Sequence, residues 1–191
     1  MLRLAMVLSC ALLLGSASRV PAQQARPRTS FWFAAGFGGG WGRVSCDICR
    51  GDRLSGLSAY LRLGGRINPR VLMGGEAAAW RKSANAVDQT LLALGAAAFW
   101  YPPPGSALYL KGGLGWVTHR VESGPDVILS TGFGPQLGVG YEFPLGRGVY
   151  LAPYCNVVLG VVGGAVKFNG ATVTGAPGVS LIQLGLALTE R

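Results

Sequence analysis

Two cysteines three positions apart form the sharpest local pattern with a chemical meaning. The segment Cys46-Asp47-Ile48-Cys49 has a spacing that suits a disulfide loop, a redox pair or half of a metal site. Two nearby thiols in an oxidising compartment favour a disulfide. A redox pair normally opens a helix, and nothing in this segment predicts one. Cys46 and Cys49 are therefore our candidates for a loop disulfide, with a metal site as the open alternative.

The chain has one histidine, His119, followed closely by Glu122 and Ser123. A histidine near a serine and an acid suits hydrolysis, for example of a lipid. A histidine with two thiolates and a carboxylate suits zinc. A histidine in a polar segment is more often only solvated, and the sequence has no phosphate loop, nucleophile elbow or paired-carboxylate motif. We therefore expect no enzymatic activity, no cofactor and no metal ion.

Four charged residues interrupt otherwise apolar segments: Arg62, Arg66, Glu76 and Lys111. An isolated charge buried in such surroundings is costly, so these side chains must pair if they share an interior. We predict that they form an ion-pair cluster that plugs this interior. A gate or an ion-conducting path is the alternative interpretation. Either requires secondary structure that turns all four toward one side.

The segment 132–144, GFGPQLGVGYEFP, indicates what that structure is. Alternate positions are large and apolar, including Phe133, Leu137 and Val139, while the positions between them are mostly glycine. A period of two residues predicts a strand with two unlike faces. Glycine makes a poor water-facing surface but suits a crowded interior. The pattern therefore favours a barrel with lipid outside and a narrow polar lumen inside.

Similar alternation recurs along the chain. We predict strands over residues 31–44, 57–67, 71–81, 89–101, 107–120, 132–144, 149–160 and 179–189. Their lengths fit the roughly nine to eleven residues of a tilted transmembrane strand. The connections after the second, fourth and sixth strands are short and the others longer. This predicts an all-β fold, an eight-stranded antiparallel up-and-down transmembrane β-barrel with both ends in the periplasm.

Two features test the predicted strands. Pro135 and Pro153 fall inside them, and we expect both near strand ends because proline removes a ladder hydrogen bond. The charge-free stretch 149–166 would also suit a helix, although Pro153 and its glycines oppose one. The five tryptophans fall toward strand ends or outward faces, as an aromatic girdle requires. They are Trp32, Trp41, Trp80, Trp100 and Trp116.

The composition agrees with a membrane barrel. Hydrophobic residues make up 50% of the 191 residues and charged residues 13%, and the mean hydropathy is +0.37. No long apolar helix follows the N-terminal region. With 31 glycines and 11 prolines, a helical bundle is disfavoured, and a closed barrel is the other way to satisfy the backbone in lipid.

The N-terminal residues predict export. Residues 1–22 have the positive start, short apolar stretch and small-residue end of a cleavable signal peptide. Residues 23–30 form a polar periplasmic arm and residues 31–191 the barrel. Loss of Arg3 and Arg19 with the signal peptide lowers the net charge from +9 to +7. These cations form no run that would suit nucleic acid, so we expect contact with outer-membrane lipid or lipopolysaccharide instead.

Gly140-Tyr141-Glu142-Phe143, the stretch Leu184–Leu188 and the alternating strands resemble the OmpA/OmpX-like eight-stranded outer membrane protein β-barrel domain family. The resemblance implies the bacterial outer membrane, insertion by the assembly machinery there, and a monomer. It implies a structural, envelope-integrity or surface-interaction role with a plugged lumen. The alternatives are a barrel that binds or passes a small hydrophobic molecule and, third, a lipid-A-modifying enzyme. Barrels of this kind usually end in an aromatic residue, whereas this sequence ends Leu-Thr-Glu-Arg.

Overall fold

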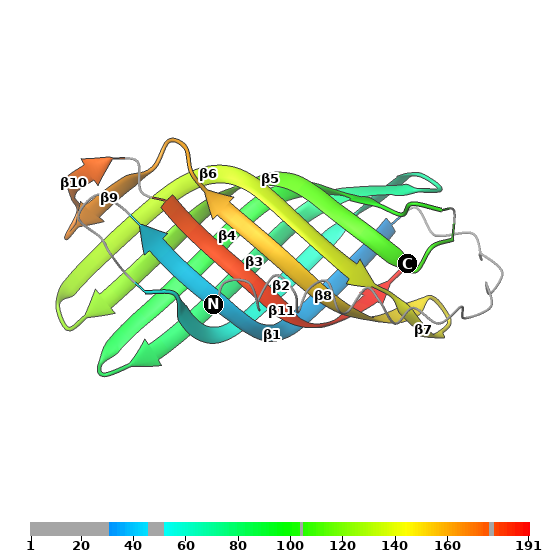
Figure 1. Ribbon diagram of the computed structural model, residues 1–191, viewed down its shortest axis with the longest axis horizontal. Helices are drawn as coiled ribbons and strands as arrows, with labels where there is room; N and C mark the ends of the chain where they lie inside the picture. The colour runs from blue at the N-terminus through cyan, green and yellow to red at the C-terminus, as the bar shows by residue number, and fades with distance from the viewer. Residues whose placement is uncertain (1–30, 46–51, 104, 176–177) are drawn as a thin grey trace, which may run out of the picture.

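The computed structural model describes residues 31–45, 52–103, 105–175 and 178–191. Within them the chain forms eight long strands and three short ones (Figure 1). The long strands are β1 (Phe31–Ser45), β2 (Leu54–Asn68), β3 (Val71–Ala84), β4 (Val87–Trp100), β5 (Leu108–Ser123), β6 (Asp126–Tyr141), β8 (Val149–Gly160) and β11 (Gly178–Glu190). The short ones are β7 (Phe143–Gly146), β9 (Ala165–Phe168) and β10 (Ala171–Gly175).

Antiparallel pairing closes the long strands into a barrel. It runs in sequence order from β1 to β6, while β11 pairs with both β1 and β8. The β1–β11 ladder extends from Phe33–Glu190 to Ser45–Gly178. Pairing of β6 with β8 over Gln136–Gly140 completes the ring. The predicted eight-stranded antiparallel barrel is therefore confirmed, and the helical alternative for residues 149–166 is wrong, because this stretch contains β8. Among the described residues, no helix is long and apolar enough to cross a bilayer.

Side chains alternate between the interior and the outer surface of the barrel, as a strand requires. In β1, Trp32 and Ala34 are buried whereas Phe33 and Phe37 are exposed. We call the outward apolar side chains the apolar band. It includes Phe33, Phe37, Leu61, Leu63, Leu94, Leu114, Leu137 and Leu186. Soluble monomers rarely expose such an extensive apolar surface, so this face is suited to lipid.

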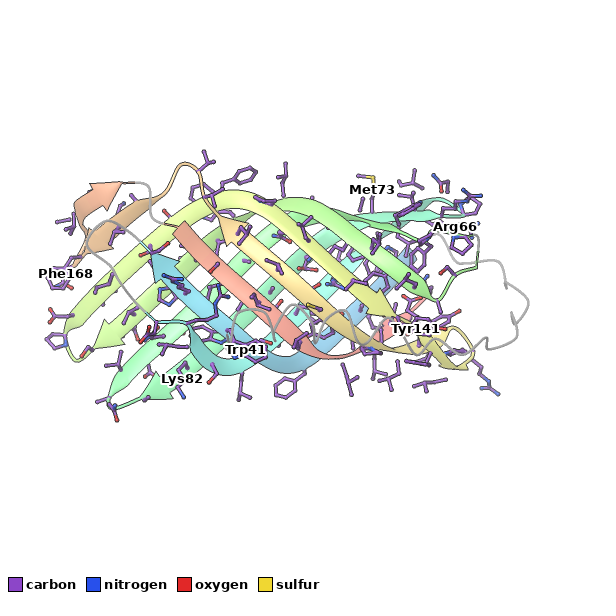
Figure 2. The ribbon with its side chains drawn as sticks, viewed as in Figure 1. Trp41, Arg66, Met73, Lys82, Tyr141 and Phe168 are labelled. Carbon is purple, nitrogen blue, oxygen red and sulfur yellow. The ribbon has the colours of Figure 1, made fainter. Side chains whose placement is uncertain are left out.

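The two ends of the barrel differ. The end that carries Phe31 and Arg191, here the terminal end, lies toward the right in Figure 2, where Arg66 and Tyr141 are labelled. The opposite end, here the loop end, carries β9 and β10 and lies toward the left, where Phe168 and Lys82 are labelled. The long strands run obliquely between these ends (Figure 1).

Two of the long loops expected from the sequence are instead tight hairpins. The expected loops covered residues 82–88 and 121–131, but β3 and β4 are joined by Asn85 and Ala86 alone, and β5 and β6 by Gly124 and Pro125. Asn85 and Ala86 both have positive φ, 52° and 59°, as in the turns that match strand twist. The strands were underestimated because their outward residues become polar here while the hydrogen-bond ladder continues. The connections over residues 46–53 and 161–177 are long, as predicted.

Pro135 and Pro153 lie inside β6 and β8, so the expectation that they sit near strand ends is wrong. Both lie where β6 meets β8, and among the described residues this is the shortest ladder between two long strands. Pro135 is adjacent to a change of register, because Gln136 pairs with Val158 whereas Phe133 bridges to Val162. Pro153 lies one residue beyond the other end of the β6–β8 ladder, which is the pair Gly140–Tyr154. Each proline thus lacks its N–H where the ladder is already interrupted.

The expected tryptophan girdle is only partly present. Trp100 and Trp116 are exposed on the outer surface, and Trp41 is half-buried there. Trp32 and Trp80 instead lie in the interior, 3% and 1% exposed. Trp32 and Trp80 occupy inward positions of β1 and β3. The alternation of side chains along a strand therefore decides where they lie, and the preference of tryptophan for the membrane boundary does not.

Candidate functional site

Three of the four charged residues singled out from the sequence meet in the middle of the lumen. Arg62 of β2 and Glu76 of β3 are direct cross-strand partners, and Lys111 reaches the same carboxylate from β5. Arg62 Nε donates to one oxygen of Glu76 and Lys111 Nζ donates to the other. All three residues are at most 4% exposed. We call Arg62, Glu76 and Lys111 the lumen cluster.

The Arg62 guanidinium is surrounded on all sides. It donates to the hydroxyls of Tyr60 (3.2 Å) and Tyr109 (3.3 Å) and to Asn156 Oδ1 (3.0 Å). Its central carbon lies 3.8 Å from the centre of the Tyr60 ring and 4.9 Å from that of Phe99. Contacts from β2, β3, β4, β5 and β8 therefore converge on one side chain, which spans the lumen.

Arg66 lies elsewhere. It is four residues farther along β2, toward the terminal end, and is half-buried. Its nearest residue across the β2–β3 ladder is Leu72. At about 3.3 Å per residue, four residues separate Arg66 from Arg62 by roughly 13 Å along the strand. The ion pairs of Glu76 come from Arg62 and Lys111.

Inward glycines accommodate the large side chains of this layer. A Cβ placed on Gly36 would lie 2.3 Å from Cε1 of Tyr60, and one on Gly140 would lie 2.4 Å from the Tyr109 hydroxyl. The space that the glycines leave is thus occupied by the two tyrosines that hold Arg62. These glycines serve close approach of a ring to a neighbouring strand.

Toward the loop end, the lumen is filled mainly by apolar side chains around Trp80. The Trp80 Nε1 donates to the Gly40 carbonyl oxygen at 2.9 Å, and the ring stacks on His119 with centroids 6.3 Å apart. Leu91, Val117 and Leu181 are fully buried in the same core. Sequence reasoning missed this role of Trp80, although its inward parity in β3 was a usable signal.

The structure separates His119 from the acid and the serine that a catalytic site would need. His119 is buried in the lumen, 5% exposed. Glu122 belongs to the outward set of β5 and forms an ion pair with Arg120, and Ser123 is exposed at the strand end. Among the described residues, no three His, Cys, Asp or Glu side chains are grouped as metal ligands. Cys46 and Cys49 lie outside the described residues, so their disulfide stays a prediction.

A second ionic contact lies at the terminal end, and sequence reasoning did not find it. The Arg191 guanidinium forms an ion pair with Glu142, and the Tyr101 hydroxyl donates to the same carboxylate at 2.9 Å. The Arg191 side chain is 2% exposed and lies over the rings of Tyr101 and Tyr150, at 4.6 and 5.2 Å. Because these residues come from four separate segments, no local sequence motif predicts their contact.

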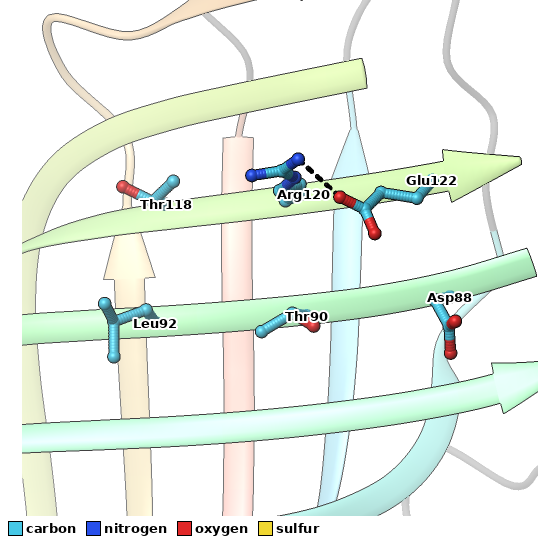
Figure 3. Close-up of a pocket in the computed structure, with 6 residues that line it drawn as sticks. All are labelled: Asp88, Thr90, Leu92, Thr118, Arg120 and Glu122. Atoms are coloured by element: carbon cyan, nitrogen blue, oxygen red, sulfur yellow. Dashed lines mark ion pairs between the residues drawn. The ribbon is translucent and has the colours of Figure 1, made fainter. Parts of the chain in front are cut away.

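The outer surface has a shallow groove at the loop end, between β4 and β5 (Figure 3). It is lined by three successive cross-strand pairs: Leu92 with Thr118, Thr90 with Arg120, and Asp88 with Glu122. Asp88 accepts a hydrogen bond from Arg81 at 3.4 Å and Glu122 pairs with Arg120 at 2.5 Å. The lining passes from apolar to charged, which marks the edge of the apolar band.

Closed strands, an apolar band outside and a buried ionic cluster inside define a transmembrane β-barrel of the bacterial outer membrane. The model of the outer membrane protein beta-barrel domain family matches residues 8–155. The chain therefore belongs to this family.

The solved structure of Neisserial surface protein A shows the same fold. Neisserial surface protein A is 18% identical, with a TM-score of 0.61, and the match covers 86% of this chain and 99% of that one. Ail, the attachment invasion locus protein of Yersinia pestis, is 15% identical (TM-score 0.49; 84% and 99% covered). OprG of Pseudomonas aeruginosa is 14% identical (TM-score 0.49; 85% and 97% covered). A comparison with curated proteins gives no match.

Proposed function

We propose that this protein is a non-conducting barrel that acts through its surfaces, in envelope integrity or in contact with other molecules at the cell surface. The observation that carries this proposal is the lumen cluster, in which Arg62 meets Glu76 and Lys111 across the interior. Eight strands enclose a lumen that side chains can just fill. A barrel filled in this way plugs its own interior.

Layers above and below the lumen cluster support the same conclusion. Trp80 and its apolar neighbours lie toward the loop end, and Glu142 with Arg191 lies toward the terminal end. A solute would have to displace buried side chains in all three layers. Opening the middle layer would break buried ion pairs, which is strongly unfavourable when it leaves a charge without its partner.

The loop end offers a surface for contact. Ile128, Phe168 and Val173 are 37%, 43% and 53% exposed, and Ile128 pairs with Phe168 across β6 and β9. Ile128 lies opposite Val121, beyond the level of Arg120, so these apolar groups project past the apolar band. In our proposal this end faces outside the cell, as the longer connections of outer-membrane barrels do.

The proposal includes contact with anionic lipid and excludes catalysis. Exposed arginines lie at the loop end, including Arg43 and Arg53, and suit phosphate-bearing head groups. His119, the one histidine, points into the lumen away from Glu122. We accordingly propose that the protein is not an enzyme on lipid.

Single-channel recording tests the proposal. The purified barrel in a planar bilayer should show no steady conductance, because its lumen is filled. A triple variant, Arg62→Ala, Glu76→Ala and Lys111→Ala, removes the lumen cluster together with its charge and should increase any residual current. Steady conductance of the unchanged protein would overturn the proposal and favour the transport alternative.

A further inference from the structure

Two arginines lie side by side on the outer surface at the loop end. The β1–β2 ladder ends with Gly42 opposite Leu54, so the next position on each segment places Arg43 beside Arg53. Arg43 belongs to the outward set of β1, as Trp41 does, and both arginines are exposed. Two positive charges therefore occupy neighbouring positions on one face.

The hydrogen bonds of Arg53 place its guanidinium next to the residues that flank Arg43. Its guanidinium donates long hydrogen bonds to the Trp41 carbonyl oxygen, at 3.5 Å, and to the Ser180 hydroxyl, at 3.4 Å. Ser180 lies directly opposite Arg43 in the β1–β11 ladder. Arg53 thus reaches across β1, and two guanidinium groups and a hydroxyl gather at one spot.

This pair differs from the other outward arginines of the loop end. Arg81 has Asp88 at 3.4 Å. Arg120 has Glu122 at 2.5 Å, the ion pair that is dashed in Figure 3. None of the ion pairs found within the described ranges includes Arg43 or Arg53. The charge of these two side chains is therefore not balanced by a described carboxylate.

Such an arrangement favours an anion. Like charges opposite each other on neighbouring strands destabilise a sheet. Partial burial, followed by the nearby charge of Arg43, holds the pKa of Arg53 below its usual range. A bound anion would remove this repulsion. Arginine suits phosphate best because its planar fork can donate two hydrogen bonds to one phosphate.

The level of the pair in the membrane indicates which anion reaches it. Trp41 is half-buried on the outer surface, and tryptophan is enriched where bilayer meets water. Arg43 is two residues farther toward the loop end, about 7 Å along the strand. On β4 the outward side chains change from apolar to charged over the same distance, from Leu92 to Asp88 (Figure 3). Arg43 and Arg53 therefore lie at the depth of lipid head groups.

We propose that Arg43, Arg53 and Ser180 form a binding site for the phosphate of an anionic lipid head group in the outer leaflet. This inference rests on the lipid contact in the proposed function and assigns it a place. The two guanidinium groups clamp the phosphate oxygens, and the Ser180 hydroxyl donates a further hydrogen bond. The balanced groove between β4 and β5 is the contrasting surface, which gains no charge neutralisation from phosphate.

Lipid binding to the folded barrel tests this site. Bisphosphorylated lipid A is titrated into detergent-solubilised protein, and the lipid-bound fraction is measured by native mass spectrometry. The Arg43→Gln/Arg53→Gln double variant should bind about tenfold or more weakly, since each charge-assisted hydrogen bond is worth at least a tenfold change. The control is Arg81→Gln/Arg120→Gln, which should lose much less. Dephosphorylated lipid A should bind all three proteins alike.

The outcomes separate this site from the broader proposal. Equal binding by the Arg43→Gln/Arg53→Gln variant and the unchanged protein would overturn the site while leaving lipid contact elsewhere intact. Competition by inorganic phosphate at millimolar concentration, with no preference for lipid A, would overturn the head-group assignment. A single Arg53→Gln variant, checked for heat-modifiable migration as a folded barrel, should retain intermediate affinity if both arginines contribute.

Discussion

The barrel uses the same kinds of ion pair in two opposite surroundings. In the lumen cluster, the side chains of Arg62 and Glu76 are 2% and 1% exposed. At the loop end, those of Arg120 and Glu122 are 55% and 44% exposed. Water and salt screen the outer pair, so it contributes little to stability. Inside, each charge depends on its partner, and in our proposal these pairs keep the lumen filled.

The largest effect should come from breaking the inner pairs on one side. Glu76→Ala leaves Arg62 and Lys111 buried without their carboxylate and should destabilise the barrel by about 3–5 kcal/mol without abolishing insertion. Glu122→Ala, which breaks the exposed pair, should cost less than about 1 kcal/mol. Urea unfolding in lipid vesicles, followed by tryptophan fluorescence, measures both. Equal stability of Glu76→Ala and the unchanged protein would show that the lumen cluster does not hold the barrel together.

A smaller effect should separate the inward and outward glycines of β1. Gly36→Ala forces Tyr60 away from its place over Arg62 and should cost about 1–3 kcal/mol, as overpacking does. Gly39 is on the outer face, where a Cβ would meet nothing within 4 Å. Gly39→Ala should therefore be neutral or slightly stabilising, since glycine weakens a strand. The same unfolding measurement applies, and a loss of stability in Gly39→Ala alone would reverse the assignment of the two faces.

The smallest expected difference concerns the tryptophans. Trp80→Phe removes the hydrogen bond to the Gly40 carbonyl and should cost about 1 kcal/mol. Trp116→Phe keeps an aromatic ring on the exposed face and should change the free energy of unfolding less. Thermal unfolding monitored by circular dichroism would compare them, and a larger loss in Trp116→Phe would indicate that the outer surface contributes more than the interior.

The sequence was sufficient for the faces of the strands but not for their register or their ends. The period of two placed Arg62, Glu76 and Lys111 on inward faces, because parity depends only on position within a strand. It gave no measure of depth, so Arg66 was grouped with them although it lies nearer the terminal end. Parity alone did not reveal that Trp80 of β3 would reach Gly40 of β1, since that contact depends on how separate strands align.

Polar residues also obscured where the strands end. Asp88 and Glu122 fell in the predicted loops because the lipid-facing alternation of apolar side chains stops before them. In the structure the backbone ladder continues, with Ser83 opposite Asp88 and Val121 opposite Gln89. The contact of Arg191 with Glu142 was equally hidden, because its members come together only when β11 completes its pairing along β1 and β8.

The interrupted ladder between β6 and β8 is where we expect the barrel to open locally. The two strands furthest apart in sequence, β1 and β11, share a continuous ladder, whereas the shortest ladder between long strands joins β6 and β8, which are close in sequence. Amide hydrogens beside Pro135 should therefore exchange first, since local opening follows the weakest pairing. A hairpin re-forms within microseconds. The hydrogen bonds between β6 and β8 can therefore open and re-form while the ladder between β1 and β11 stays intact.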